Sequence, residues 1–130
     1  MATRSEIRFA TRQEGQSFSE HPSAIHARFY AHWDGYPEYR GVEVAESILV
    51  GQKIDSWEIE SLTANHTDLE YIYYVWQAPG KETFISIFER DDYSEKSWEL
   101  SNQNDYFKCI FVGMPKALID KYKQNTDKDG

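Results

Sequence analysis

The chain has little cysteine, no long apolar run and fewer basic than acidic residues. Its single cysteine, Cys109, cannot form an internal disulfide, and its apolar neighbours indicate a small buried hydrophobic side chain. No run approaches the roughly eighteen apolar residues of a membrane span, and the polar N-terminus has no signal-peptide core. These absences argue against a disulfide-stapled or membrane protein and predict a cytoplasmic one.

The 14 basic and 22 acidic residues give a formal net charge of −8, and the excess is unevenly placed. Residues 1–40 balance five Arg against five acids, so residues 41–130 carry the whole excess. An acidic surface repels the phosphate backbone, which disfavours direct nucleic-acid binding. Two interpretations stay open: the acidic surface keeps the protein soluble, or it engages a basic partner surface, including one that normally binds DNA or RNA.

The most informative stretch runs from Ala24 to Pro37. Its odd positions from Ile25 to Trp33 are apolar, and its even positions are polar. Because alternate side chains of a strand point to opposite faces, this pattern predicts one apolar face and one basic, hydrogen-bonding face. The even positions are His26, Arg28, Tyr30 and His32.

A turn and a helix are predicted directly after this strand. Asp34-Gly35 favours a tight turn, in which Gly would supply the positive φ. Pro37 suits a first helical position, and Gly51 is typical of the residue just past a helix end. The residues expected to face inward from this helix are Val42, Ala45, Ile48 and Leu49.

The remaining pattern predicts a single α+β domain over residues 1–130, frayed from about residue 124. Further strands are expected at 5–12, 69–77, 82–90 and 106–112, and a second helix after Pro115. Segments 69–77 and 82–90 should form a hairpin, and the last strand should be central because it has few polar residues. Shorter features are a mobile connection at 13–23, a strand or helical turn within 52–68, and a short strand at 96–100.

The element order β-β-α-β-β-β-α predicts a two-layer fold with both helices on one face of a mostly antiparallel sheet. In that arrangement the polar face of the 25–33 strand is open to water, a ligand or a partner subunit. Four aromatic residues could form a stacking platform for a base, although core packing is the more common role. The aromatic residues concerned are Trp33, Tyr36, Tyr71 and Trp76.

Two short motifs resemble a family of small bacterial and phage proteins of uncharacterised activity. They are Met1 to Ser5 and the His-Trp-Asp-Gly-Tyr-Pro segment from His32 to Pro37, with weaker similarity at Tyr71–Trp76. The stretch from Arg12 to Pro22 is longer and more polar than the resemblance would suggest. The resemblance implies a bacterial or phage context and no mechanism.

The candidate ligand-binding residues are His26, Arg28, Tyr30, His32 and Asp34. A guanidinium beside a phenol can hold an anionic small molecule such as a nucleotide, and Arg4, Arg8 and Arg12 could add to the same positive patch. Pairing of Arg28 with acidic neighbours is the structural alternative. We predict no metal and no cofactor, since six strand residues place His26 and His32 about 20 Å apart.

Three functions follow in order of preference. The first is a non-enzymatic binding module for an anionic small ligand or a protein partner, forming a homodimer through the open sheet face. The second is a small hydrolase or transferase in which His32 acts as acid or base and Asp34 orients it. The structural alternative is that Asp34 caps the helix. The third is an acidic inhibitor that mimics nucleic acid.

Overall fold

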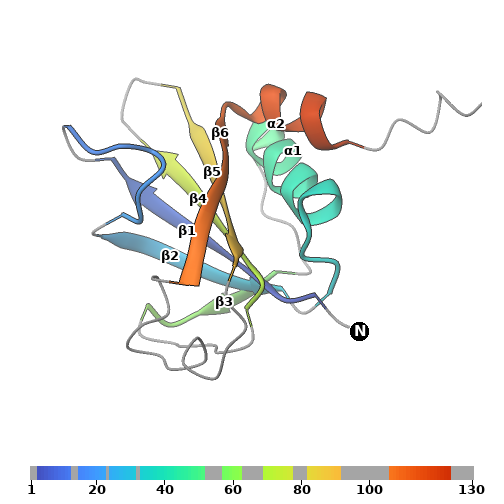
Figure 1. Ribbon diagram of the computed structural model, residues 1–130, viewed down its shortest axis with the longest axis horizontal. Coiled ribbons are helices and arrows are strands. Elements are labelled where there is room, and N and C mark those ends of the chain that lie inside the picture. Colours follow the sequence, from blue (N-terminus) through green and yellow to red (C-terminus); the bar gives the residue numbers. More distant parts are fainter. Residues whose placement is uncertain are drawn as a thin grey trace, which may run out of the picture.

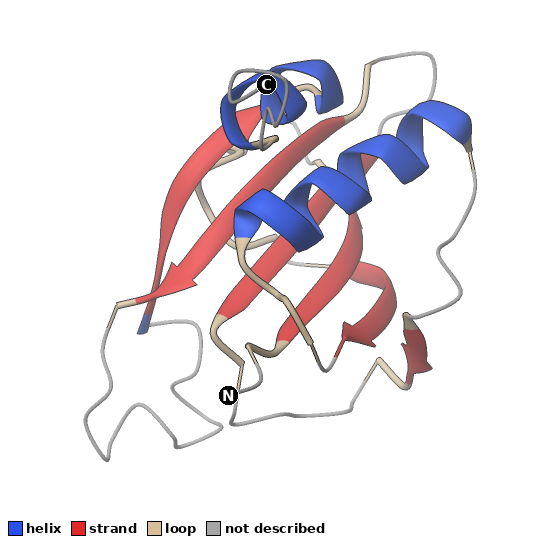
Figure 2. Cartoon of the chain, turned by 90° about the vertical axis from the view of Figure 1, so that its right-hand side faces the viewer, coloured by secondary structure: helices blue, strands red, loops and turns tan. Residues whose placement is uncertain are grey.

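The computed structural model describes residues 3–12, 15–22, 24–31, 33–51, 57–62, 69–77, 82–91 and 106–123. These ranges form one six-stranded sheet, and both helices pack on the same face of it (Figures 1 and 2). The predicted two-layer α+β fold is confirmed. The predictions for 96–100 and for the tail from 124 lie outside the described residues.

The sheet is mixed, with the strand order β3-β2-β1-β4-β5-β6. Neighbouring strands are antiparallel except for β1 and β4, which run parallel. The elements are β1 (Ser5–Thr11), β2 (Ile25–Ala31), a turn of π-helix η1 (Pro37–Gly41), α1 (Val42–Val50), β3 (Glu58–Glu60), β4 (Tyr71–Gln77), β5 (Phe84–Arg90), β6 (Phe107–Gly113) and α2 (Pro115–Tyr122).

The predicted hairpin of β4 and β5 is confirmed, and β3 is the short strand expected within 52–68. The central position predicted for the last strand is wrong, because β6 pairs only with β5 among the described strands. Its low polarity has another cause: Phe107 is buried on one sheet face, and the Phe111 ring packs edge-on against Tyr122 of α2. An edge strand with packed side chains on both faces can therefore have the apolar composition that is typical of a central strand.

The apolar face predicted for 25–33 is confirmed at Phe29 and Ala31 but not at its two ends, Ile25 and Trp33. Phe29 and Ala31 lie beneath the helices. The β1–β2 pairing shifts between Phe9 and Ala10, and this bulge moves Ile25 to the core on the opposite face. Trp33 follows the end of the strand and is 65% exposed, so it does not belong to the core.

The turn and helix after β2 follow the sequence closely. Pro37 begins η1, and Gly51 ends α1 in the left-handed conformation with φ 72°. The positive φ in the turn belongs to Asp34 (51°), whereas Gly35 is required for space, since a Cβ there would lie 2.7 Å from the Thr3 carbonyl oxygen. The inward position predicted for Leu49 is wrong, because that side chain is 61% exposed.

Each face of the sheet carries a buried cluster, so the open polar face predicted for β2 is wrong at Tyr30. Tyr30 is 3% exposed and lies in an apolar cluster with Tyr74 and Trp76. Part of the connection predicted to be mobile covers this face. Phe18 packs edge-on against Trp76, and Ser86 Oγ donates a hydrogen bond to the Phe18 carbonyl at 2.5 Å.

Tyr73 of β4 connects the sheet to the turn after β2. Its hydroxyl is fully buried and donates a hydrogen bond to the Gly35 carbonyl. Burial raises the pKa of Tyr73 well above its ordinary value, because the phenolate would lose its hydration. The folded protein therefore holds this proton at a pH at which the unfolded chain loses it.

We expect stability to fall as the pH rises above about 10, the ordinary pKa of tyrosine, since the unfolded state then binds fewer protons than the folded state. Replacing Tyr73 by Phe should lower the free energy of unfolding at neutral pH by about 1–3 kcal/mol through the unsatisfied Gly35 carbonyl. It should also make the alkaline decline shallower. Urea unfolding at neutral and alkaline pH measures both effects.

The matched control is Tyr39→Phe, because the Tyr39 side chain is 55% exposed. This variant should retain the stability of the unmodified protein at neutral pH. An alkaline decline in Tyr73→Phe as steep as that of the unmodified protein would contradict the role given to Tyr73.

Candidate functional site

The structure places Arg28 and Tyr30 on the same sheet face, with Tyr30 in the core and Arg28 partly buried. We name the polar group around Arg28 the ion cluster; it consists of Glu6, Arg8, His21, Arg28 and Tyr74. Glu6 Oε1 lies 2.5 Å from Arg8 Nε and 3.2 Å from Arg28 Nε. One carboxylate, itself fully buried, therefore faces two guanidinium groups.

The ion cluster continues toward the segment that covers it. Arg8 Nη1 donates a hydrogen bond to the Tyr74 hydroxyl at 2.9 Å, and that hydroxyl lies 2.7 Å from His21 Nδ1. Burial and the neighbouring charge of Arg8 lower the pKa of Arg28. Arg28 is thus paired with an acidic neighbour, Glu6, as the structural alternative predicted.

The other predicted site residues have separate surroundings. His26 is exposed beside the β-bulge, with its Nε2 2.6 Å from Thr11 Oγ1. Asp34 is exposed in the turn beyond the other end of β2, and its Oδ1 accepts a hydrogen bond from the Tyr36 hydroxyl at 3.3 Å. His32 lies outside the described residues. The described part of the candidate set therefore does not meet at one place.

The described ranges contain neither a metal-binding cluster nor a membrane-spanning helix. Within them, no three His, Cys, Asp or Glu side chains gather in a way that could hold a metal ion. No helix among the described residues is long and apolar enough to cross a membrane.

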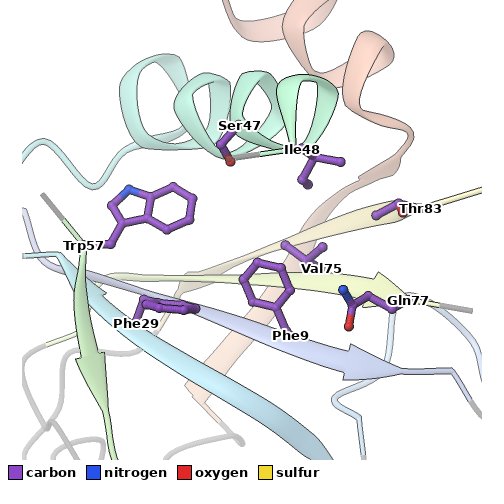
Figure 3. Close-up of a pocket in the computed structure, with 9 residues that line it drawn as sticks. Phe9, Phe29, Ser47, Ile48, Trp57, Val75, Gln77 and Thr83 are labelled. Atoms are coloured by element: carbon purple, nitrogen blue, oxygen red, sulfur yellow. The ribbon is translucent and has the colours of Figure 1, made fainter. Parts of the chain in front are cut away.

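A hollow of about 350 Å³ lies on the helical face of the sheet, between the end of α1 and strands β1, β2 and β4 (Figure 3). We call it the α1 cavity. Aromatic side chains from three parts of the chain form much of its wall, and they are Phe9, Phe29 and Trp57. Successive rings are 5.7 Å and 6.0 Å apart between centroids, which is the ordinary range for packed aromatic pairs.

A chain of polar contacts holds Trp57 in place. Its Nε1 donates a hydrogen bond of 2.6 Å to Glu43 Oε1, and the same oxygen accepts from Arg40 Nη1. Arg40 is 5% exposed, and its Nη2 donates to the Trp33 carbonyl at 2.5 Å. The indole is thus fixed from α1 and from the turn after β2, so the aromatic wall is set before any ligand arrives.

The rest of the cavity wall is aliphatic and polar but uncharged. Ile48 and Val75 supply apolar surface from α1 and β4. Ser47, Gln77 and Thr83 supply polar groups, and Ser47 Oγ already donates to the Val44 carbonyl at 2.7 Å. None of the described residues that line the cavity is charged. The cavity can therefore accept an uncharged, largely apolar molecule, whereas a bare ion would find no opposite charge among the described lining residues.

Few features of the sequence indicate this cavity. Its aromatic residues look like ordinary core positions, and Trp57 lies in the stretch with no clear period. The contact of Trp57 with Glu43 joins residues fourteen positions apart, and no local pattern predicts it. The one local signal is Ser47, a small polar residue in the otherwise apolar end of α1.

The contact between Glu43 and Trp57 predicts the effect of Glu43→Gln. Loss of the carboxylate charge should weaken both hydrogen bonds and lower the free energy of unfolding by about 1.5–3 kcal/mol, the usual range for hydrogen bonds to charged groups. The Trp57 indole N–H signal should shift in a proton–nitrogen NMR spectrum, and its exchange with solvent should accelerate.

Glu46→Gln is the matched control on the same helix, because the pair that Glu46 forms with Lys123, at 3.1 Å, is exposed. Such pairs contribute about 0–1 kcal/mol. An unshifted indole signal in Glu43→Gln, or equal stability losses in the two variants, would contradict the anchoring role.

The ion cluster predicts a larger effect for Glu6→Gln. That change leaves the buried Arg8 guanidinium and the partly buried Arg28 guanidinium without their shared carboxylate, and breaking a buried pair in this way costs about 3–5 kcal/mol. Urea unfolding beside the Glu46→Gln control measures the difference. A loss within 1 kcal/mol of the control, about the size of a surface pair, would show that Glu6 does not compensate the two charges.

Comparison with known proteins gives no family: no family model, no curated protein and no solved structure matches the chain. The resemblance of Met1 to Ser5 and His32 to Pro37 to small bacterial and phage proteins therefore stays a prediction.

Proposed function

We propose that this protein is a non-enzymatic binding module and that its ligand site is the α1 cavity. The observation that supports the proposal is a cavity of about 350 Å³ with aromatic walls and a few polar groups. Small-molecule sites have roughly this composition and span about 300–1,000 Å³. A Trp side chain held by a carboxylate also favours binding, because a pre-organised wall spares the ligand the cost of ordering it.

The other functions considered from the sequence have less support. The guanidinium of Arg28, proposed for anion binding, already faces the Glu6 carboxylate. The sheet face proposed for homodimer contact is covered where Phe18 packs on Trp76. For the hydrolase, Asp34 is exposed and contacts Tyr36, and His32 is outside the described residues. The acidic mimic rests on net charge alone.

Binding in the cavity can be tested with a panel of small probes observed by saturation-transfer NMR. Suitable probes are indole, cyclohexanol, benzoate and benzylamine, which cover neutral aromatic, neutral aliphatic, anionic and cationic chemistry. We expect saturable binding of at least one probe. Thr83→Phe, which places a ring in the cavity from its rim, should weaken that binding at least tenfold.

Glu82→Gln serves as the control, because its exposed side chain precedes Thr83 and does not line the cavity. It should bind as the unmodified protein does, and circular dichroism should confirm that both variants are folded. The proposal fails if no probe binds, or if binding in a folded Thr83→Phe variant equals that of the unmodified protein.

A further inference from the structure

We infer that the ligand of the α1 cavity is an uncharged molecule of about two fused rings with one hydrogen-bonding group, which lies at the mouth while the rings lie inside. This inference rests on the proposed function and specifies the class of ligand. It draws on three properties of the cavity: its size, the arrangement of its polar groups, and the charge of its lining.

Size sets the number of rings. A cavity of about 150 Å³ lined by apolar side chains accommodates one benzene molecule. The α1 cavity holds about 350 Å³, a little over twice that volume. A bicyclic aromatic molecule with a small substituent therefore fills it, whereas a single ring leaves much of the wall without contact.

The lining is graded from apolar to polar. Trp57 and Phe29 lie toward one end of the cavity, and Gln77 and Thr83 lie toward the opposite end (Figure 3). Trp57 is 2% exposed, whereas Gln77 is exposed. The aromatic end is thus the buried end, and the amide and hydroxyl groups mark the mouth. A ligand that matches this gradient inserts its rings first.

Hydrogen bonding at the mouth is suited to a neutral polar group. The Gln77 amide offers both a donor and an acceptor, and the Thr83 hydroxyl can serve as either. Aromatic rings at the buried end contribute packing and edge-to-face contacts without fixing a hydrogen-bond pattern. Discrimination between ligands that share the same rings should therefore come from the mouth, and from Gln77 above all.

The uncharged lining, as far as it is described, disfavours ionised ligands. None of the described lining residues carries a charge, so none of them would compensate an ion for its lost hydration. A formal net charge of −8 further disfavours anions near the surface. A neutral amide should consequently bind better than a carboxylate of the same shape.

Calorimetric titration with indole, indole-3-carboxamide and indole-3-carboxylate tests the three properties together. The carboxamide and the carboxylate have nearly the same size, so their comparison isolates charge. We expect the carboxamide to bind at least as tightly as indole and at least tenfold more tightly than the carboxylate. In Gln77→Leu the carboxamide should weaken about 3–10-fold, the usual effect of one lost hydrogen bond, while indole stays unchanged.

Each contrary outcome overturns the inference. A carboxylate that binds as tightly as the carboxamide contradicts the uncharged ligand. Equal weakening of indole and the carboxamide in Gln77→Leu contradicts the position of the polar group. Absence of binding by all three indoles contradicts the ring class. If cyclohexanol, benzoate or benzylamine still binds and is lost in Thr83→Phe, the proposed function stands without this ligand class.

Discussion

The shape of the cavity depends on the Glu43 carboxylate, which accepts hydrogen bonds from Arg40 and from the indole of Trp57. Arg40 is buried and also binds the carbonyl of Trp33, so the contact connects the turn after β2, the start of α1 and the residue that precedes β3. Without it, the indole would have no polar partner among the described residues and could rotate into the hollow beside Phe29.

The ion cluster lies on one face of the sheet beside an apolar cluster, whereas the described side chains of the other face are mainly apolar and lie under the helices. Alternation along β1 places Glu6 and Arg8 on one face and Ile7 and Phe9 on the other. The charged face is buried with its ions paired, at a desolvation cost that only well-placed partners offset. The apolar face lies under the helices, and there the end of α1 leaves part of the aromatic surface uncovered by protein. A binding function belongs more naturally to this second face.

Local signals in the sequence predict much of the fold. Pro37, Gly51 and Pro115 mark helix ends correctly, because their backbone preferences act over one or two residues. The errors concern long-range packing. A bulge opposite Phe9 moves Ile25 to the other face, and the docking of Phe18 converts a face predicted to be open into a core. The residue pattern of one strand does not indicate which distant segment will pack against it.

The sequence predicts less of the candidate site than of the fold. Arg28 and Tyr30 do share a face, as alternation predicts, but whether a face binds ligand or forms core depends on what packs on it. The cavity wall combines Phe9, Phe29 and Trp57, three residues that meet only through the register of β1 with β2 and the return of the chain at β3. Each looks like an ordinary core residue, so a single sequence does not distinguish the wall of a cavity from a filled interior.

Crystal structures of the protein alone and with indole-3-carboxamide test the preformed cavity most directly. The expected result is an open α1 cavity in the free protein, with the Trp57 indole on Glu43, and a bound ring system in the same position with the amide beside Gln77. A free structure in which Trp57 or Ile48 fills the hollow would contradict a preformed site, and so would a ligand bound elsewhere while the cavity stays closed.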